Sequence, residues 1–513
     1  MSYFSNLGQK INFISNKYPN KVALIIGDNR FTFWEIHERS NQISNWLIKK
    51  NIIPGDRICI SSEKTMNNFC IMIACLKIGA IYTFFDRKSP IARIKKIFKV
   101  LNVNIIFHNE LNFLFFDKNI QIYNSDSLIK KFNLQNKVLD QCLVDRVKSN
   151  QLAYIMFTSG STGEPKGVAI SHNKVLKFSE WSFKEFDLKQ NDKVTGLNSF
   201  FFDNSIFDIF TAFFNGLTLV LIKREELLNA IKLNQYLNKV KVTIWFSVPS
   251  LIIYFMNFNK NKKIFLKSIK KIIFGGEGFP KGNLKNLFSI VKNRSELINV
   301  YGPTECTCIC SHHKITKKDF SKNEIRNLAP LGNNLWPNFK SIIVDTNNKI
   351  VKNGEIGELL IGGENVALGY YNRDKLTDEK FVQNPEHTSF LDIVYRTGDL
   401  VYRNKNNDYL YFSSRIDDQI KFMGHRIELG EIENAVNSID KVIEAFVSFG
   451  KFRGNDQITC WINHSSEIKI IKRKLDKMLP KYMLPRKFID SKNIKKNKNG
   501  KIDRVYLKKS YYD

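Results

Sequence analysis

Helical and strand patterns alternate through most of the chain, and this alternation limits how the chain can fold. Phe33–Lys50 carries apolar residues at helical spacing, and a Pro-Gly-Asp turn then leads into a short apolar strand, Arg57–Ser61. Phe69–Leu76 next predicts a helix, and Ile81–Phe85 predicts a strand. Chains that alternate in this way pack helices against largely parallel sheets. The sequence therefore predicts an α/β fold.

The chain is too long for one compact core, because it has 513 residues. From about residue 340 the pattern changes to short strands between Asn/Gly turns, at Ile342–Asp345, Glu358–Ile361 and Tyr409–Phe412. Near the C-terminus two apolar strands, Ala445–Phe449 and Gln457–Ile462, precede a helix at Lys469–Leu479. We expect a large domain over residues 1–416, with parallel-sheet α/β subdomains and a β-rich subdomain. A small, mobile α+β domain is expected over residues 417–513.

The net charge of +30 favours acidic partners, since 79 Lys and Arg residues face only 49 Asp and Glu residues. The basic residues are spread along the whole chain among Asn and Ile, which favours a compositional bias over a nucleic-acid site. No signal peptide is visible at the N-terminus, and Lys77 and Gly79 interrupt the longest apolar stretch. We therefore expect a cytoplasmic protein that binds neither nucleic acid nor a membrane.

The eight cysteines do not form the pattern of a disulfide scaffold. Cys306, Cys308 and Cys310 alternate along what the sequence predicts to be a strand, so their side chains should share one face. Their spacing differs from that of zinc ligands. We expect them to be small buried residues.

The segment Tyr154–His172 combines a strand with a loop rich in Ser, Thr and Gly, followed by Lys166. Glycines and hydroxyls let backbone N–H groups and side-chain oxygens approach an anion closely, and Lys166 adds a positive charge. The spacing is not that of a Walker A loop. A flexible linker is the alternative, but the strand-like segments on both sides disfavour it.

With these motifs the chain resembles the adenylate-forming superfamily of acyl-CoA synthetases, luciferases and nonribosomal-peptide adenylation domains. The resemblance covers almost the whole chain. Eight blocks occur in family order: Phe31–Ile60, Leu76–Pro90, Tyr154–Gly167, Asn299–Thr307, Gly357–Tyr370, Tyr395–Leu400, Arg415–Glu433 and Asn499–Arg504.

The resemblance implies that a substrate carboxylate joins the α-phosphate of ATP and expels pyrophosphate, with Mg²⁺ as a further cofactor. Matching the family motifs residue by residue implies an ATP-binding set of Thr158, Ser159, Gly160, Ser161, Thr162, Gly163, Lys166, Asn299, Tyr301, Gly302, Asp399 and Arg415. Thr304 then contacts the α-phosphate, and Glu305 is the carboxylate that binds Mg²⁺, which prefers hard oxygen ligands. Such a site brings anions together and needs positive charge.

The resemblance also assigns the catalytic lysine and the moving parts. Lys501 matches the lysine that bridges the substrate carboxylate and the α-phosphate, although it lies in a basic run that could be an ordinary solvated surface. Asp417 matches the hinge at which the small domain rotates. Gly424 matches the position that a pantetheine arm passes in the thioester step.

Asp203 indicates the subclass. Amino-acid-activating members carry Asp at this place, where it pairs with the substrate α-ammonium group; a helix N-cap is the alternative interpretation. The other matched pocket positions, apart from Lys501, are Asn204, Phe207, Phe246, Ile273, Gly275, Val300, Cys308 and Ile309. This set is mostly apolar and has no second charge, so a branched aliphatic amino acid such as isoleucine, valine or leucine is expected.

The chain ends soon after Lys501 with no carrier segment, which favours transfer in trans to a small acidic phosphopantetheinyl carrier protein. D-alanine–carrier-protein ligases also resemble the chain, but many of them have a larger side chain where Gly275 stands. A carboxylic acid–CoA ligase is a further alternative. A non-catalytic RNA- or membrane-binding protein would be expected to have decayed motifs, and the motifs here are intact.

Overall fold

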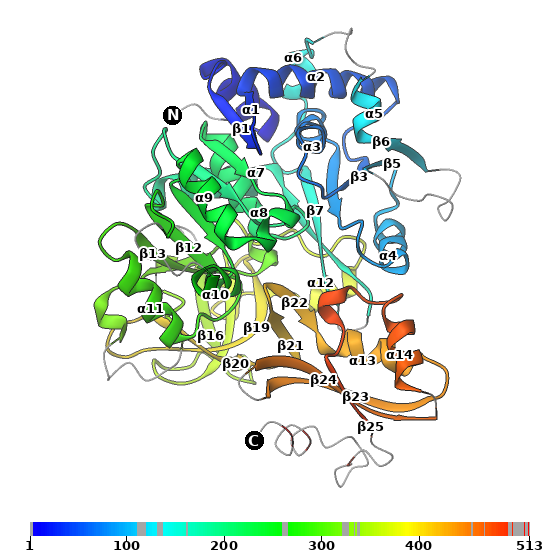
Figure 1. The fold of residues 1–513 in the computed structure, drawn as a ribbon, viewed down its shortest axis with the longest axis vertical. Helices are drawn as coiled ribbons and strands as arrows, with labels where there is room; N and C mark the ends of the chain where they lie inside the picture. Colours follow the sequence, from blue (N-terminus) through cyan, green and yellow to red (C-terminus); the bar gives the residue numbers. More distant parts are fainter. Residues whose placement is uncertain are drawn as a thin grey trace. The chain divides into compact units, whose positions relative to one another are not determined.

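The computed structural model describes residues 4–109, 120–130, 137–160, 163–258, 265–320, 328–332, 334–335, 339–452, 455–465 and 467–490, with Lys495, Leu507 and Tyr511. The predicted α/β class is confirmed (Figure 1). The chain forms two compact units. The first contains residues 1–85, 101–156 and 167–416; the second contains 86–100, 157–166 and 417–513. The first unit ends at Ile416, but two internal segments that we expected in the large domain group with the C-terminal residues. No helix in the described ranges is long and apolar enough to cross a membrane.

A nine-stranded sheet lies in the first unit. In spatial order it contains β15 (Asn334–Leu335), β14 (Ser311–Lys314), β13 (Glu296–Tyr301), β12 (Lys271–Gly275), β11 (Ile244–Ser247), β9 (Lys193–Gly196), β10 (Thr218–Leu221), β1 (Val22–Ile26) and β2 (Asn29–Thr32). The strands from β13 to β1 are parallel, and the outer ones are antiparallel. Phe246, Gly275 and Tyr301 therefore lie at the carboxyl ends of parallel strands, where α/β proteins bind ligands.

Helices accompany this sheet and bury apolar faces in the core. They are α1 (Leu7–Lys17), α7 (His172–Glu185), α8 (Asn204–Ile206), α9 (Ala230–Val240), α10 (Pro249–Phe258) and α11 (Lys281–Val291). The fully buried Trp245 of β11, for example, packs edge-on against Phe255 of α10, with ring centroids 5.1 Å apart. Such contacts fix the strand ends that carry the candidate site.

A second sheet has six strands, in the order β6 (Gln121–Asn124), β5 (Ile105–His108), β3 (Arg57–Ser61), β4 (Ile81–Phe85), β7 (Leu152–Thr158) and β8 (Lys166–Ser171). Strands β3 and β4 begin and end at the residues that the sequence predicted. The predicted helices are α2 (Phe33–Lys49) and α3 (Met66–Ile78); the remaining ones are α4 (Ile91–Leu101), α5 (Ser125–Lys130) and α6 (Gln141–Asp145). Helix α2 starts with a capping box between Thr32 and Glu35.

Helix α3 buries Lys77 completely. The Lys77 ammonium donates a hydrogen bond to Asn41 Oδ1 at 2.6 Å and lies 3.3 Å from His37 Nδ1. Burial lowers the pKa of Lys77 to about 7. Burial and the nearby charge of Lys77 lower the pKa of His37 to about 3. The folded chain therefore holds the Lys77 proton less tightly than the unfolded chain does.

We expect the free energy of unfolding to rise with pH above about 7 because of Lys77. Below about pH 7, Lys77 is protonated in both the folded and the unfolded chain. Between about pH 7 and the ordinary lysine pKa of 10.5, Lys77 stays protonated only in the unfolded chain, so the free energy of unfolding rises with pH. Urea unfolding should show that the wild type gains roughly 2 kcal/mol more than Lys77→Met between about pH 7 and about pH 9. Lys49→Met, which changes an exposed lysine of α2, should keep the rise. Parallel pH curves for the wild type and Lys77→Met would contradict the expectation.

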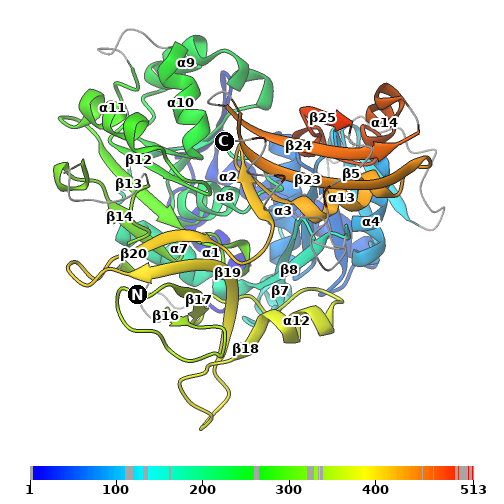
Figure 2. The same ribbon diagram turned by 90° about the horizontal axis from the view of Figure 1, so that it is seen from below.

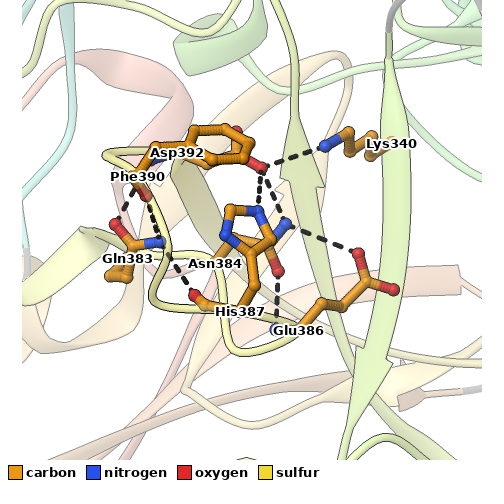
Figure 3. Close-up of polar contacts among 7 residues, drawn as sticks. All are labelled: Lys340, Gln383, Asn384, Glu386, His387, Phe390 and Asp392. Atoms are coloured by element: carbon orange, nitrogen blue, oxygen red, sulfur yellow. Dashed lines mark hydrogen bonds and ion pairs between the residues drawn. The ribbon is translucent and has the colours of Figure 1, made fainter.

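The predicted β-rich region is a five-stranded antiparallel sheet of β16 (Lys340–Val344), β17 (Gly357–Gly362), β18 (Phe381–Gln383), β19 (Ile393–Arg403) and β20 (Leu410–Arg415), with helix α12 (Asp374–Lys380). Figure 3 shows polar side chains converging on Asp392, between β18 and β19. Its carboxylate accepts hydrogen bonds from Asn384 at 2.8 Å and His387 at 3.2 Å and pairs with Lys340 at 3.0 Å. The hydrogen bond from Asn384 and, to a lesser extent, those from Lys340 and His387 lower the pKa of Asp392. This hydrogen-bond network stabilises the loop between β18 and β19. Phe390 and Leu391 of the same loop are exposed.

The C-terminal part of the second unit contains the hairpin β21 (Gln419–Phe422) and β22 (His425–Glu428), and a sheet of β23 (Val442–Phe452), β24 (Asn455–His464) and β25 (Lys487–Asp490). Figure 2 shows the latter three strands side by side. Helices α13 (Leu429–Asn437) and α14 (Ile468–Leu475) share its core. Helix α14 ends four residues earlier than predicted. After Leu475 the backbone hydrogen bonds become irregular, with i→i−3 bonds at Lys477 and Met478 and an i→i−4 bond at Leu479. Pro480 follows, and a proline disfavours helix at the residue before it.

Candidate functional site

Asp203 lies at the start of α8, close to the turn that follows β13. Its side chain makes no N-cap hydrogen bond to α8, so capping does not account for this residue. Its Oδ2 instead accepts a hydrogen bond from the hydroxyl of Thr304, in the 3₁₀ turn Thr304–Cys306. The structure therefore joins the residue predicted to bind the substrate amine with the residue predicted to contact the α-phosphate.

The helix after Asp203 changes its winding at Phe207. Residues Phe207–Thr211 form a π-helical turn, an irregularity that occurs frequently at functional sites. The turn aims Phe207 at Phe246 of β11, with ring centroids 4.8 Å apart in an edge-on arrangement, and both side chains are fully buried. Two predicted pocket residues from distant parts of the sequence thus form one apolar wall.

Two buried ionisable residues interact electrostatically at this turn, Asp208 within it and Lys64 outside it, and neither was predicted to have a role. Asp208 accepts hydrogen bonds from the Asn198 backbone N–H at 3.2 Å and from its side chain at 3.0 Å. The Lys64 ammonium is buried and donates to the carbonyls of Gly196, Leu197 and Ile222. Burial raises the pKa of Asp208 and lowers that of Lys64, and the attraction between the two charges opposes both shifts. No spacing rule in the sequence connects these two residues.

The remaining pocket positions lie on and around β12 and β13. Gly275 pairs with Val300, and a side chain at Gly275 would be blocked because its Cβ would lie 2.4 Å from the Val300 carbonyl oxygen. Ile273 is buried in β12, and Asn204 begins α8. Gly302 is equally constrained, since a Cβ there would lie 2.3 Å from the Cys308 carbonyl oxygen. The glycines thus allow close backbone approach.

The predicted strand through the three cysteines is wrong. Cys306 ends a 3₁₀ turn, Thr307 and Cys308 have positive φ angles of 54° and 79°, and β14 starts only at Ser311. Two consecutive left-handed residues break the alternation that a strand requires. Burial of the cysteines is confirmed. Such strain in a non-glycine backbone concentrates at functional sites.

Asp399 lies at the centre of a second cluster in the first unit. Its Oδ2 accepts a hydrogen bond from the Tyr301 hydroxyl at 2.6 Å, and Arg415 forms an ion pair with its Oδ1. Arg415 also donates to the Thr397 carbonyl at 3.1 Å. Asn299, on the same strand as Tyr301, donates to the Pro330 carbonyl at 2.7 Å. The structure thus brings together Tyr301, Asp399 and Arg415, three residues that the resemblance assigned to ATP binding.

Glu305 is fully buried, and Tyr370 orients it. The Tyr370 hydroxyl donates to Glu305 Oε1 at 2.7 Å, and the Ala367 N–H donates to the Glu305 carbonyl at 2.7 Å. The ring of Tyr370 packs against Phe381. The block Gly357–Tyr370 was recognised in the sequence, but no sequence pattern linked the Tyr370 hydroxyl to Glu305.

The Ser/Thr/Gly loop belongs to the second unit and turns tightly at Gly160. A Cβ there would lie 2.0 Å from the Glu164 carbonyl oxygen, and Gly163 has a φ of 79°. The hydroxyl oxygen of Thr158 is buried without a hydrogen-bond partner among the residues the structure describes. Lys166 forms an ion pair with Glu428 at 3.3 Å. An anion-binding loop needs hydrogen-bond donors that remain available and glycines that let the backbone turn tightly. The Thr158 hydroxyl and the turn at Gly160 fit this description.

The residues predicted to serve as the hinge and in the thioester step lie at the boundary and in the β21–β22 hairpin. Asp417 is the first residue of the last segment of the second unit, and its side chain accepts a 3.3 Å bond from the Gln419 N–H. Met423 and Gly424 both have positive φ, as a two-residue type I′ hairpin turn requires. The turn alone therefore explains a glycine at 424. Ser161, Thr162 and Lys501 lie outside the described residues.

The described residues include no cluster of three or more metal-ligating side chains. Glu305 offers a buried carboxylate within the 3₁₀ turn Thr304–Cys306. One carboxylate suits Mg²⁺, which is usually bound by one or two carboxylates together with substrate phosphates.

Comparisons with known proteins agree with the motifs. Residues 14–371 match the family described as AMP-binding enzyme. Bacitracin synthase 1 of Bacillus licheniformis is 32% identical over 494 residues, which is 96% of this chain but 9% of that protein. The chain therefore spans less than a tenth of this relative.

Many solved structures share the fold, among them the following two. NpsA-ThdA, an artificially fused adenylation–PCP di-domain NRPS from Klebsiella oxytoca, has a TM-score of 0.82 at 22% identity and covers 95% of this chain and 94% of its own. The o-succinylbenzoate CoA synthetase MenE from Bacillus subtilis has a TM-score of 0.84 at 20% identity, with 97% of both chains covered. The family match, the ordered motifs and the shared fold agree. The chain belongs to the AMP-binding enzymes of the adenylate-forming superfamily.

Proposed function

We propose that this enzyme activates an amino acid with ATP and then passes the aminoacyl group to a thiol. The contact between Asp203 and Thr304 carries the proposal. It places a carboxylate that can pair with an α-ammonium group beside a hydroxyl that can contact a phosphate. A carboxylate at the mouth of an apolar pocket is a general way to hold a zwitterion.

The residues present fit ATP. In our proposal Thr158, Ser159, Gly160, Ser161, Thr162 and Lys166 bind the β- and γ-phosphates, and the buried unpartnered Thr158 hydroxyl supports this role. Asp399 accepts from the ribose hydroxyls; a carboxylate has about four acceptor sites, so it can do so while bonded to Tyr301 and Arg415. The Tyr301 ring packs on the adenine, and Asn299 contacts its edge.

The first half-reaction joins the two bound anions. An oxygen of the substrate carboxylate forms a bond to the α-phosphorus, the bond from that phosphorus to the bridging oxygen breaks, and pyrophosphate leaves with the electron pair. Lys501 and Thr304 stabilise charge on the α-phosphate. Glu305 would hold Mg²⁺, which would supply positive charge against the phosphates. In the second half-reaction a thiolate attacks the acyl carbon, and AMP leaves.

The side-chain pocket supports a branched aliphatic amino acid. Phe207 and Phe246 form an apolar wall, and Ile273, Val300, Cys308 and Ile309 are buried. Gly275 cannot carry a larger side chain without movement of β12 or β13, because Val300 already fills the space that its Cβ would take. Selection among isoleucine, valine and leucine depends on single methylene groups and is correspondingly modest.

The thiol is proposed to be the phosphopantetheine of an acidic carrier protein. NpsA-ThdA is itself a fusion of an adenylation domain and a PCP. The net charge of +30 supports an acidic partner. The basic stretch Lys492–Lys509 would attract such a partner, and it lies almost wholly outside the described residues.

The deciding experiment is ATP–pyrophosphate exchange with a panel of isoleucine, valine, leucine, D-alanine, 3-methylbutanoate and 4-methylpentanoate. We expect the three branched amino acids to support exchange best, and exchange to require Mg²⁺. A preference for D-alanine would instead indicate a D-alanine–carrier-protein ligase. A preference for the acids without an amine would indicate a carboxylic acid–CoA ligase. Acyl transfer to a holo-carrier and to free CoA, measured across a salt series, then tests the partner.

Tyr370→Phe is expected to raise the Mg²⁺ concentration needed for half-maximal exchange by about tenfold or more. The variant keeps the ring against Phe381 but removes the hydroxyl that orients Glu305, and losing such an orienting partner commonly weakens metal sites by about 10- to 100-fold. A Mg²⁺ titration at saturating ATP measures the change. Tyr236→Phe, which loses a hydroxyl bonded to the Gly27 carbonyl, is the matched control. An unchanged Mg²⁺ requirement in Tyr370→Phe would mean that the hydroxyl does not act through a metal site.

A further inference from the structure

The predicted phosphate-binding lysine already has an anionic partner within the second unit. Lys166 Nζ lies 3.3 Å from Glu428 Oε1, and the two side chains are only 11% and 7% exposed. Two residues earlier on β22, the Arg426 carbonyl accepts a hydrogen bond from the Ser159 hydroxyl at 2.8 Å. Strand β22 thus contacts both Ser159 and Lys166 of the loop. These are two of the residues that we propose to bind phosphates.

Because the pair of Lys166 and Glu428 is nearly buried, it contributes more to the energy of the site than an exposed ion pair would. Exposed ion pairs contribute little, because water solvates both charges in either state. A nearly buried lysine, by contrast, needs an anion beside it. The Glu428 carboxylate and a phosphate oxygen are the same kind of acceptor for an ammonium group, and each carries negative charge. One compact ammonium charge does not neutralise both, so carboxylate and phosphate repel each other around Lys166.

We propose that Glu428 is a positioning residue that competes with the β- and γ-phosphates of ATP for Lys166. The inference rests on the proposed phosphate-binding role of Lys166. Binding ATP then requires Lys166 to leave Glu428, so the observed nucleotide affinity is lower than Lys166 alone would give. The same competition acts against pyrophosphate and favours its release. AMP has neither phosphate, and its affinity does not depend on Glu428.

A neighbouring ion pair provides a matched control. Glu431 of α13, three residues after Glu428, pairs with Arg93 of α4. These side chains are similarly buried, at 5% and 11% exposure. Glu431→Gln therefore removes a buried carboxylate from the same region of the unit without removing the partner of Lys166.

The test is calorimetric binding of Mg·ATP, Mg·pyrophosphate and AMP to the full chain, without amino acid so that no turnover occurs. We expect Glu428→Gln to lower the dissociation constants for ATP and pyrophosphate by about tenfold, the change for one charge-assisted hydrogen bond that no longer has to be broken. AMP affinity should not change, and Glu431→Gln should bind all three like the wild type. In a Lys166→Met background, Glu428→Gln should have no effect. Glu428→Asp, which shortens the reach of the carboxylate, should change affinity in the same direction and serves if Glu428→Gln does not fold.

Each other result overturns the inference. Unchanged or weaker ATP binding in Glu428→Gln would show that Glu428 does not compete. Equal tightening for AMP, or for Glu431→Gln, would show a general loosening of the unit. If Lys166→Met bound ATP like the wild type, the proposed role of Lys166 in phosphate binding would fail as well. If Lys166→Met weakened ATP binding while Glu428→Gln changed nothing, only the competition would fail.

Discussion

Replacing Lys501 with alanine is expected to slow amino-acid-dependent pyrophosphate exchange by about 100- to 1,000-fold. This is the cost of removing one charged or hydrogen-bonding group that stabilises a developing oxyanion. The lysine lies in the Asn-Gly-Lys-Ile-Asp-Arg block at Asn499–Arg504, and the prediction rests on that block. The dissociation constant of Mg·ATP should change much less than the exchange rate, because the ammonium acts on the reacting groups.

Lys495 is a control for Lys501, because it is an exposed member of the same basic run. Lys495→Ala removes a surface charge near Lys501 in the sequence and should exchange pyrophosphate at nearly the wild-type rate. Similar losses in both variants would indicate that the run acts through its total charge. Exchange by Lys501→Ala at the wild-type rate would remove Lys501 from the catalytic role.

Local patterns were sufficient to predict several elements of the fold. Strands β3 and β4 and helix α2 agree with their apolar spacing and turn residues almost to the residue. The composition of the two units was not predictable in this way. The segments 86–100 and 157–166 group with the C-terminal residues through contacts such as Arg93 with Glu431, which are 338 positions apart in the sequence. No periodicity encodes such a pairing.

In the candidate site, too, sequence motifs predicted which residues take part, but not the contacts and backbone angles that depend on distant parts of the chain. Motifs indicated the candidate residues, and the structure places Asp203 against Thr304 and Asp399 against Tyr301. The geometry of Thr307 and Cys308 was not predictable, because neither residue type favours positive φ. The surrounding fold imposes that conformation; the Thr307 hydroxyl, for example, donates to the Asn365 carbonyl at 2.7 Å.

Asp203→Ala is expected to lower kcat/KM for the preferred amino acid by about 100-fold, since the α-ammonium group would be buried without its anionic partner. The loss should be selective. 3-Methylbutanoate and 4-methylpentanoate have the side chains of valine and leucine but no amine, so their rates should stay within a fewfold of the wild type. The measurement is the ratio of kcat/KM for each amino acid to that of its des-amino partner, from pyrophosphate exchange.

The ratio separates recognition from structural support, because Asp203 also bonds to Thr304. If Asp203 acted only by holding Thr304, both substrates of each pair would lose activity equally. Asp208→Asn is the control, since it changes a buried carboxylate one turn further along the same helical segment, bonded to Asn198. That variant should lower stability, and any loss of exchange should be the same with and without the amine. A selective loss confined to Asp203→Ala would therefore identify Asp203 as the residue that recognises the amine, and equal losses in that variant would leave it a structural role.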